Sequence, residues 1–349
     1  MQVSPLCLGT FMFGAEWGNT DRVESTAIIH AALDAGINFV DTADVYSAGE
    51  SERIVGRALA GGRRDGVILA TKVHGQVEGS DPNRRGNSRR WITQACEDSL
   101  RRLGTDWIDL YQIHRPDPDT DIDETLGALT DLVRAGKIRA FGASKFPASQ
   151  IVEAQWTAER RGRERFVTEQ PPYSILVRGP ESEVLPTCQR YGMGVMTWSP
   201  LAGGWLTGRY RKGPASRDQR FDIASPDNQA QLEAVEQLAL LAEDAGVTLI
   251  HLALAFVLQH PAVTAPIIGP RTMEQLESQI GAVDVTLTTE LLDRIDEIVA
   301  PGTTLATLAA DFVPPAIADP TLRRRGPFRA RARPLDSATS GETSSRSAS

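Results

Sequence analysis

Short apolar runs alternate with amphipathic segments along most of the chain. Each run is continuous in apolar residues and is bounded by glycine or polar residues, which is typical of parallel strands buried on both faces. The pattern predicts eight strands, at residues 6–8, 38–41, 67–71, 108–113, 138–143, 167–170, 194–198 and 265–268. We therefore expect a buried sheet whose strands run parallel to one another.

The segments between the runs carry apolar residues at helical spacing. In residues 23–35, for example, Val23, Ala27, Ile28 and Ala31 fall on one face, and Gly36 follows as a C-cap. The same pattern predicts helices at residues 23–35, 88–103, 123–135, 149–161, 182–191 and 273–282, with two further helices at 228–245 and 249–259. Eight strand–helix units in one chain place it in the α/β class and favour a (β/α)8 TIM barrel with extra helices over an open sheet.

The last part of the chain has a different composition. After about residue 314 the sequence becomes rich in Arg, Pro, Ser and Thr, and it includes the basic stretch LRRRGPFRARARP. Such a segment cannot bury enough apolar surface to offset the entropy of ordering it. We therefore expect a barrel domain at residues 1–313 and a disordered, mobile tail at residues 314–349. The composition of this tail favours a solvated segment over a binding element.

Composition and charge narrow the classes of function. Of the 349 residues 41% are hydrophobic, enough for a large core, and the formal net charge of −8 argues against binding to nucleic acid or to anionic membranes. No apolar run approaches the ~20 residues that a membrane helix needs. The first residues lack the basic and apolar regions of a secretory signal. The cysteines, Cys7, Cys96 and Cys188, are widely separated, and no CxxC or HExxH pair is present, which predicts reduced thiols in a cytoplasmic protein without a metal site.

Four polar residues lie at the ends of predicted strands or just beyond them: Asp41, Tyr46, Lys72 and His114. The C-terminal ends of barrel strands share one face, so these side chains can gather there into one site. A tyrosine has an ordinary pKa of roughly 10, and a neighbouring ammonium or imidazolium lowers it. We expect Tyr46 to donate a proton to a carbonyl oxygen, with its pKa lowered by Lys72 and with Lys72 held by Asp41. His114 would hydrogen-bond the same carbonyl oxygen and orient it.

The stretches around these residues resemble a known family. DTADVYSAGESERIVGRAL, which contains Asp41 and Tyr46, and WIDLYQIHRPD, which contains His114, are similar to segments of the aldo-keto reductases, NADPH-dependent carbonyl reductases. The resemblance covers residues 3–300 and indicates a bacterial branch related to potassium-channel β subunits. It implies that the four residues form a catalytic tetrad that acts on a small aldehyde or ketone. The β-hairpin that usually opens the family's barrel has no counterpart before residue 3, so we expect it to be absent.

The cofactor residues are expected mainly in the loops after the last two strands. No GxGxxG follows a strand, so a Rossmann site is not indicated, whereas barrels bind phosphate with these loops and a helix N-terminus. SPLAGGWLTGRY and IIGPRTMEQLESQIGA fit this arrangement, and Arg271 at a helix start suits the 2′-phosphate of NADPH better than NADH. By resemblance, the NADPH contacts are Thr10, Asp41, Ser144, Lys145, Gln170, Trp198, Ser199, Leu201, Gly203, Arg209, Gly269, Arg271, Gln275 and Gln279.

The nicotinamide and substrate ends show features of their own. Many of these reductases have Ser-Asn where this chain has Ser144-Lys145, and a lysine cannot accept a hydrogen bond from an amide. A basic residue here marks a branch that includes the channel β subunits. Candidates for contact with the substrate are Phe11, Trp17, His114 and Trp205. A run of arginines after strand three fits a solvated loop better than a site for an anionic substrate; it comprises Arg84, Arg85, Arg89 and Arg90.

Two other functions are compatible with the resemblance. The first is an NADPH-binding regulatory protein of the channel β-subunit kind, and the second is a dehydrogenase that works mainly in the oxidative direction. Retention of His114 counts against the first, because the channel subunits resemble the family but replace this histidine. A preference for NADH would favour the second. The sequence indicates neither the natural substrate nor the oligomeric state.

Overall fold

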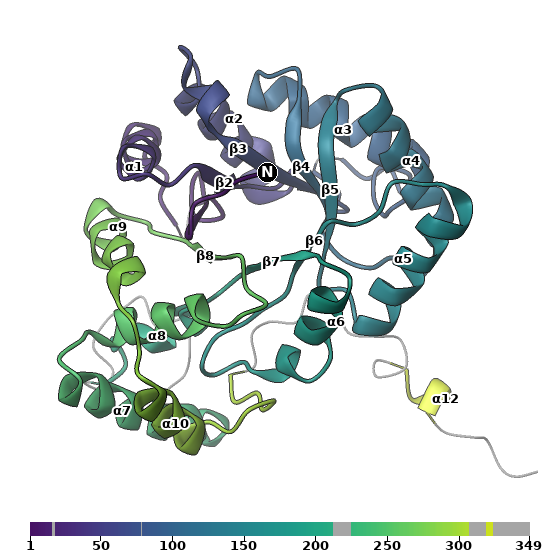
Figure 1. Cartoon of the computed structure of the whole chain (residues 1–349). Coiled ribbons are helices and arrows are strands. Elements are labelled where there is room, and N and C mark those ends of the chain that lie inside the picture. Colours follow the sequence, from purple (N-terminus) through teal and green to yellow (C-terminus); the bar gives the residue numbers. More distant parts are fainter. Residues whose placement is uncertain (16–17, 78, 212–224, 307–318, 324–349) are drawn as a thin grey trace, which may run out of the picture. The chain divides into compact units, whose positions relative to one another are not determined.

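Eight parallel strands close into a barrel in the computed structural model (Figure 1). The structure describes residues 1–15, 18–77, 79–211, 225–306 and 319–323. The strands are β1 (Cys7–Gly9), β2 (Phe39–Asp41), β3 (Ile68–Val73), β4 (Ile108–Ile113), β5 (Ile138–Ser144), β6 (Thr168–Gln170), β7 (Gly194–Thr197) and β8 (Ala265–Ile268). Each strand pairs with the next, and β8 returns to β1, where Cys7 lies opposite Ile267. The predicted (β/α)8 barrel is confirmed, and every predicted strand lies within two residues of its observed bounds.

Helices surround the barrel and connect its strands (Figure 1). They are α1 (Arg22–Asp34), α2 (Glu50–Ala58), α3 (Arg89–Leu103), α4 (Ile122–Arg134), α5 (Ala148–Arg161), α6 (Val184–Arg190), α7 (Gln229–Asp244), α8 (Leu249–Leu258), α9 (Met273–Ile280) and α10 (Thr289–Ile298). The eight predicted helices agree with the observed bounds within two residues. The apolar pattern did not predict α2, which follows β2, or α10, which follows the last strand.

The packing of α2 explains why its sequence pattern is weak. Its buried face includes the polar residues Ser51 and Glu52, which interrupt the apolar stripe expected of a core helix. Gly56 lies inside the helix, where glycine is unfavourable for helix formation. A Cβ atom on Gly56 would lie 2.5 Å from the carbonyl oxygen of Leu103, the last residue of α3. Close approach of α2 to α3 therefore requires glycine at this position.

Apolar side chains fill the barrel interior below the C-terminal ends of the strands. One cluster comprises Cys7, Phe39, Ala70, Leu110, Met196, Ala265 and Ile267, contributed by six of the eight strands. A larger apolar layer packs between the outer face of the sheet and the helices. Because the interior is packed with side chains, polar residues that act on a ligand are restricted to the C-terminal face, where the connecting loops begin.

The chain divides into two units, Met1–Ala309 and Ala310–Ser349. The barrel belongs to the first unit, and the described residues of the second form one short helix, α12 (Pro320–Arg323). The boundary predicted between residues 313 and 314, and most of the predicted tail at 314–349, lie outside the described residues. Within the described ranges no single helix has the length and apolarity to cross a membrane; α7 and α8 meet that test only jointly, and they are bent by 93°.

Candidate active site

The four tetrad residues come together at the C-terminal ends of β2, β3 and β4. Asp41 ends β2, Lys72 lies in β3, His114 follows β4, and Tyr46 begins the turn after β2. The Lys72 ammonium donates to Asp41 Oδ2 at 2.5 Å, to the carbonyl oxygen of Thr42 at 2.8 Å and to the Tyr46 hydroxyl at 3.2 Å. Its three protons are therefore all engaged, and its position beside the phenol is fixed.

Two amide side chains hold the other oxygen of Asp41. Gln112 Nε2 donates to Asp41 Oδ1 at 3.0 Å, and Gln170 Nε2 donates to the same oxygen at 3.1 Å. Lys72 is fully buried and Asp41 is 2% exposed, so this ion pair is shielded from solvent. Burial by itself would lower the pKa of Lys72, but Asp41 and the Tyr46 oxygen outweigh burial and raise it above its ordinary value of 10.5. The lysine is therefore a permanent cation at neutral pH.

The pKa of Tyr46 differs from the expectation. Burial raises the pKa of Tyr46 above its ordinary value of 10.0, the Lys72 ammonium opposes this rise, and the carboxylate of Asp41 adds to it. Lys72 therefore acts in the direction that the sequence suggested, but removal of the phenol from water is the larger effect. Without a bound ligand Tyr46 is a neutral phenol that holds its proton beside a fixed cation.

His114 faces the edge of the Tyr46 ring, with the two ring centroids 5.8 Å apart. Its own pKa lies well below the ordinary 6.5, because burial disfavours the imidazolium and because Lys72 and Lys145 add positive charge nearby. The imidazole is therefore neutral at neutral pH and carries one N–H that can donate a hydrogen bond. Phe11 contacts the Tyr46 ring from another direction, at 4.9 Å, and is 43% exposed, which suits a wall of the substrate pocket.

Strained backbone surrounds the site. Among the described residues, positive φ angles at positions other than glycine occur at Ser47, Ala48, Lys145, Ser199 and Ala202. All five follow the C-terminal ends of β2, β5 or β7. Residues with a Cβ atom disfavour this region, and such strain gathers at functional sites. The strained residues thus mark the same face of the barrel as the tetrad.

The expected nicotinamide residues lie at the ends of β5, β6 and β7. Ser144 Oγ donates to the carbonyl oxygen of Gln170 at 2.9 Å, which ties β5 to β6. The Lys145 ammonium lies 5.1 Å from the ring centroid of Trp198, a cation–π contact. Indole Nε1 of Trp198 is buried and has no hydrogen-bond partner in the described part of the chain.

The loops after β7 and β8 contain the residues expected to bind the phosphates and the adenosine. Gly203 and Gly204 have positive φ, and the exposed Arg209 lies near Gly204. At the start of α9, the backbone N–H of Arg271 donates to Gln275 Oε1 at 2.8 Å, and Asn19 Nδ2 donates to the Arg271 carbonyl oxygen. No described side chain bonds to the Arg271 guanidinium. The remaining predicted residues, Ser199, Leu201, Gly269 and Gln279, lie in the same two loops and in α9.

Comparison with known proteins identifies the family. The model of the aldo/keto reductase family matches residues 5–300. The chain belongs to the aldo/keto reductase family. It is 43% identical to an uncharacterized oxidoreductase of Bacillus subtilis over 311 residues, covering 85% of this chain and 93% of the relative. It is 38% identical to an aldo-keto reductase of the same bacterium, covering 83% and 88%, and 37% identical to a probable voltage-gated potassium channel subunit beta of Arabidopsis thaliana, covering 85% and 94%. The protein is thus an oxidoreductase of a family that typically uses NAD(P)H and small carbonyl substrates.

Two of the predicted site residues of this aldo/keto reductase, Trp205 and Thr10, are buried. Trp205 is 1% exposed and packs against Tyr210 at 4.8 Å between ring centroids, so it belongs to the core, and its predicted contact with the substrate stays a prediction. Thr10 is fully buried, and its hydroxyl contacts Ser51 Oγ at 2.8 Å and the carbonyl oxygen of Asp41 at 3.2 Å. Its hydroxyl thus lies against the backbone of Asp41, and its predicted contact with the cofactor stays a prediction. Trp17 lies outside the described residues.

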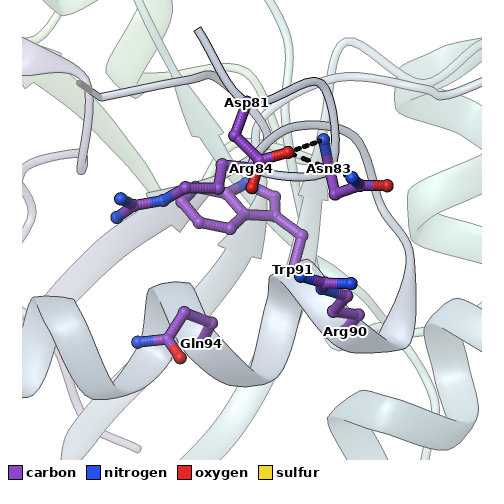
Figure 2. A pocket seen from close by; sticks show the side chains of 6 residues that line it. All are labelled: Asp81, Asn83, Arg84, Arg90, Trp91 and Gln94. Carbon is purple, nitrogen blue, oxygen red and sulfur yellow. Dashed lines mark hydrogen bonds between the residues drawn. The ribbon is translucent and has the colours of Figure 1, made fainter. Parts of the chain in front are cut away.

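The arginine-rich segment after β3 borders a cavity of about 300 Å³, shown in Figure 2. Asp81, Asn83, Arg84, Arg90, Trp91 and Gln94 line it. The Arg84 guanidinium lies 5.5 Å from the Trp91 ring centroid and bonds to Asp98, while Arg89 pairs with Asp131. Two of the four arginines are therefore engaged with acids of the aldo/keto reductase barrel itself. This arrangement favours the solvated loop over a site for an anionic substrate.

Buried acids behind the tetrad were not recognised in the sequence. Asp44, two residues before Tyr46, is fully buried, and neither of its carboxyl oxygens has a described partner. Burial and then the nearby Glu52 raise the pKa of Asp44 well above its ordinary 3.8. Glu52 accepts hydrogen bonds from Thr71 and Arg102, both at 2.6 Å. The signal that could have revealed these acids is a polar residue within a stretch that must be buried.

Proposed function

We propose that this protein reduces a small aldehyde or ketone to an alcohol with NADPH, and that Tyr46 is the general acid. The observation that carries the proposal is the contact of the Tyr46 hydroxyl with the Lys72 ammonium at 3.2 Å, with Lys72 itself held by Asp41. When bound, NADPH supplies the hydride that adds to the carbonyl carbon. The oxygen then requires a proton, and the phenol next to a fixed cation is the group placed to give it.

Lys72 stabilises the product of that proton transfer. Tyr46 becomes a phenolate after it donates its proton, and an ammonium at hydrogen-bond distance lowers the energy of this anion. Asp41 keeps Lys72 from turning away, because the carboxylate and the Thr42 carbonyl oxygen hold the other two ammonium protons. The raised pKa of the free phenol ensures that Tyr46 is protonated before the reaction begins.

His114 orients the substrate and does not serve as a cation. Because its pKa lies well below 6.5, the neutral imidazole donates one hydrogen bond to the carbonyl oxygen. The Tyr46 and His114 rings meet edge-on with their centroids 5.8 Å apart, so both residues can reach one oxygen atom at the centre of the site. Phe11 closes the side of the pocket that faces Tyr46.

Several polar atoms fit NADPH. Gln170 Nε2 is bound to Asp41 Oδ1, so the amide oxygen of Gln170 is the atom that would accept from the carboxamide, while Ser144 lies beside it. The buried Gln279 Oε1 has no described partner and fits the amino group of an adenine. The Arg271 guanidinium, at the start of α9, would bind a 2′-phosphate. Trp198 would stack on the nicotinamide, with Ser199, Leu201, Gly203, Arg209, Gly269 and Gln275 around the phosphates.

Replacement of Tyr46 by phenylalanine tests the proposal. Tyr46→Phe should lower kcat for an aromatic aldehyde roughly 100- to 10,000-fold, the usual contribution of a general acid, while NADPH still binds. Tyr111→Phe is a matched control, because its buried hydroxyl has no described partner and lies in β4 away from the tetrad. Unchanged turnover in Tyr46→Phe would refute the role of Tyr46, and absence of turnover in the wild type would refute the reductase proposal itself.

A second candidate function is NADPH-dependent regulation of a partner protein. The 37% identity to a probable potassium channel β subunit favours it, whereas the complete tetrad with His114 favours catalysis. A third, oxidation of alcohols, is favoured by the 33% identity to a putative aryl-alcohol dehydrogenase of Saccharomyces cerevisiae. Initial rates measured in both directions at the same pH separate these functions. The regulatory protein would bind NADPH without turnover, and the dehydrogenase would turn over alcohols faster than aldehydes.

A further inference from the structure

A fully buried glutamate lies next to the site and has no part in the chemistry proposed above. Glu169 precedes Gln170 in β6, and neighbouring residues of a strand point to opposite faces. Gln170 points into the barrel, where it contacts Asp41 and Gln112, so the Glu169 side chain points out towards the helices. No described basic side chain pairs with Glu169. A buried acid without a cation requires an explanation.

The hydrogen bonds of Glu169 all involve backbone N–H groups near the nicotinamide end of the site. Its Oε1 accepts from the N–H of Phe146 at 3.1 Å, and the nearby backbone N–H groups of Lys145 and Gln170 also act to lower the pKa of the carboxyl. Lys145 has a φ of 63°, in the left-handed region that residues with a Cβ disfavour. The Glu169 carboxyl is therefore bound to the residue that directly follows the strained Lys145, and it lies close to the Lys145 N–H as well.

The same turn is tied to β6 from its other side. Ser144 Oγ donates to the carbonyl oxygen of Gln170, and Ser144 pairs with Gln170 at the end of the β5–β6 ladder. The end of β5 and the end of β6 are thus joined inside the barrel by Ser144 and outside it by Glu169. The turn directs the Lys145 side chain over Trp198, the aromatic residue at the end of β7.

We propose that Glu169 is a positioning residue whose buried carboxyl sets the turn at Lys145 and so holds Ser144, Lys145 and Gln170 against the nicotinamide end of the cofactor. The proposal rests on the function proposed above, because it assumes that NADPH binds at these residues. The Glu169 side chain points to the outer face of the sheet, away from Gln170 and Asp41, so it acts only through the backbone that it holds.

A comparison of two ligands isolates this effect without measuring turnover. NADPH contacts both ends of the cofactor site, whereas 2′,5′-ADP lacks the nicotinamide and contacts only the adenosine end. In Glu169→Leu, which removes the acceptor but keeps the side chain of similar size, the Kd for NADPH should rise about 10-fold, equivalent to about 1.4 kcal/mol. The Kd for 2′,5′-ADP should stay unchanged. Glu169→Gln, whose amide oxygen can still accept the N–H groups, should bind both ligands as the wild type does.

Thr264→Val serves as the matched control. Thr264 Oγ1 accepts the backbone N–H of Val195 at 3.0 Å at the opposite end of the barrel, so this variant also loses a side-chain acceptor for a strand N–H. It should leave both Kd values unchanged. Hydrogen exchange provides a local readout, because the amides of Lys145 and Phe146 should lose protection in Glu169→Leu and keep it in Thr264→Val.

Glu169→Asp keeps the test valid if the leucine variant does not fold. Aspartate is shorter by one methylene, so it cannot reach the Phe146 N–H, and it should weaken NADPH selectively. Equal weakening of both ligands, or no weakening in a folded Leu or Asp variant, would overturn the positioning role while wild-type turnover still supports the reductase. Failure of the wild type to bind NADPH would overturn both proposals.

Discussion

Stability against pH is the most direct consequence of a buried glutamate. Burial raises the pKa of Glu169 from 4.5 to about 8, against the opposing effect of its backbone hydrogen bonds. The folded state therefore keeps the Glu169 proton to a higher pH than the unfolded state does. By linkage, the stability that this proton confers is fully present below about pH 4 and is lost as the pH rises towards 8. Glu169→Gln removes this dependence, because an amide does not titrate.

The magnitude follows from the two pKa values. A pKa difference between 4.5 and about 8 amounts to about 5 kcal/mol in total, since one pKa unit is 1.36 kcal/mol. At pH 5 the wild type has already lost roughly 1 kcal/mol of this stabilisation. It loses about 4 kcal/mol more between pH 5 and pH 9. Glu169→Gln should therefore gain about 4 kcal/mol relative to the wild type over that interval.

Urea denaturation followed by circular dichroism at pH 5, 7 and 9 measures this gain. The difference between variant and wild type isolates Glu169, since His114, Asp44 and the other shifted groups titrate in both proteins. Burial and then the nearby Glu169 raise the pKa of the Cys188 thiol, so a change at Glu169 also affects this thiol. The comparison is therefore repeated in a Cys188→Ala background. A difference that varies by less than about 1 kcal/mol from pH 5 to 9 would refute a protonated Glu169 in the folded state.

Two further variants test the ion pair and the cofactor choice. Lys72→Met should lower kcat at least ~100-fold and destabilise the fold by about 3–5 kcal/mol, because it leaves the Asp41 carboxylate buried and unpaired. Adding Asp41→Asn should recover part of that stability but none of the activity, as urea denaturation and initial rates would show; a double variant no more stable than Lys72→Met would contradict the ion-pair argument. Arg271→Ala should weaken NADPH about 10- to 100-fold and NADH little, since only NADPH offers a 2′-phosphate for charge-assisted bonds. Equal losses in fluorescence titrations would remove Arg271 from that role.

The place of the tetrad could be predicted from the sequence because barrel topology leaves little choice. Strands predicted at 38–41 and 67–71 put Asp41 and Lys72 at neighbouring strand ends, and parallel pairing brings such ends together. The side-chain contacts follow from that pairing once both residues face the barrel interior. The pKa of Tyr46 could not be predicted in the same way, because it depends on how burial and an ammonium at 3.2 Å oppose each other.

The roles of the two tryptophans after β7 could not be separated by sequence alone. Trp198 and Trp205 lie in one loop region, and an aromatic side chain in such a loop fits either a ligand or the core. The structure buries Trp205 against Tyr210 and leaves Trp198 half-buried under the Lys145 ammonium. Ser199, Ala202, Gly203 and Gly204, which lie between the two tryptophans, all have positive φ angles.

Polar residues inside strands that are buried on both faces also indicate the site. Gln112, Glu169 and Gln170 each interrupt such a strand, and a buried polar group must find a partner or destabilise the fold. Their partners are Asp41 on the inside of the barrel and the Lys145 turn on the outside. Since Asp41 holds Lys72 and Lys72 holds the Tyr46 hydroxyl, the position of the proposed general acid depends on the amides of Gln112 in β4 and Gln170 in β6. Gln170 was expected from the family resemblance, whereas Gln112 and Glu169 are indicated only by their polar character inside buried strands.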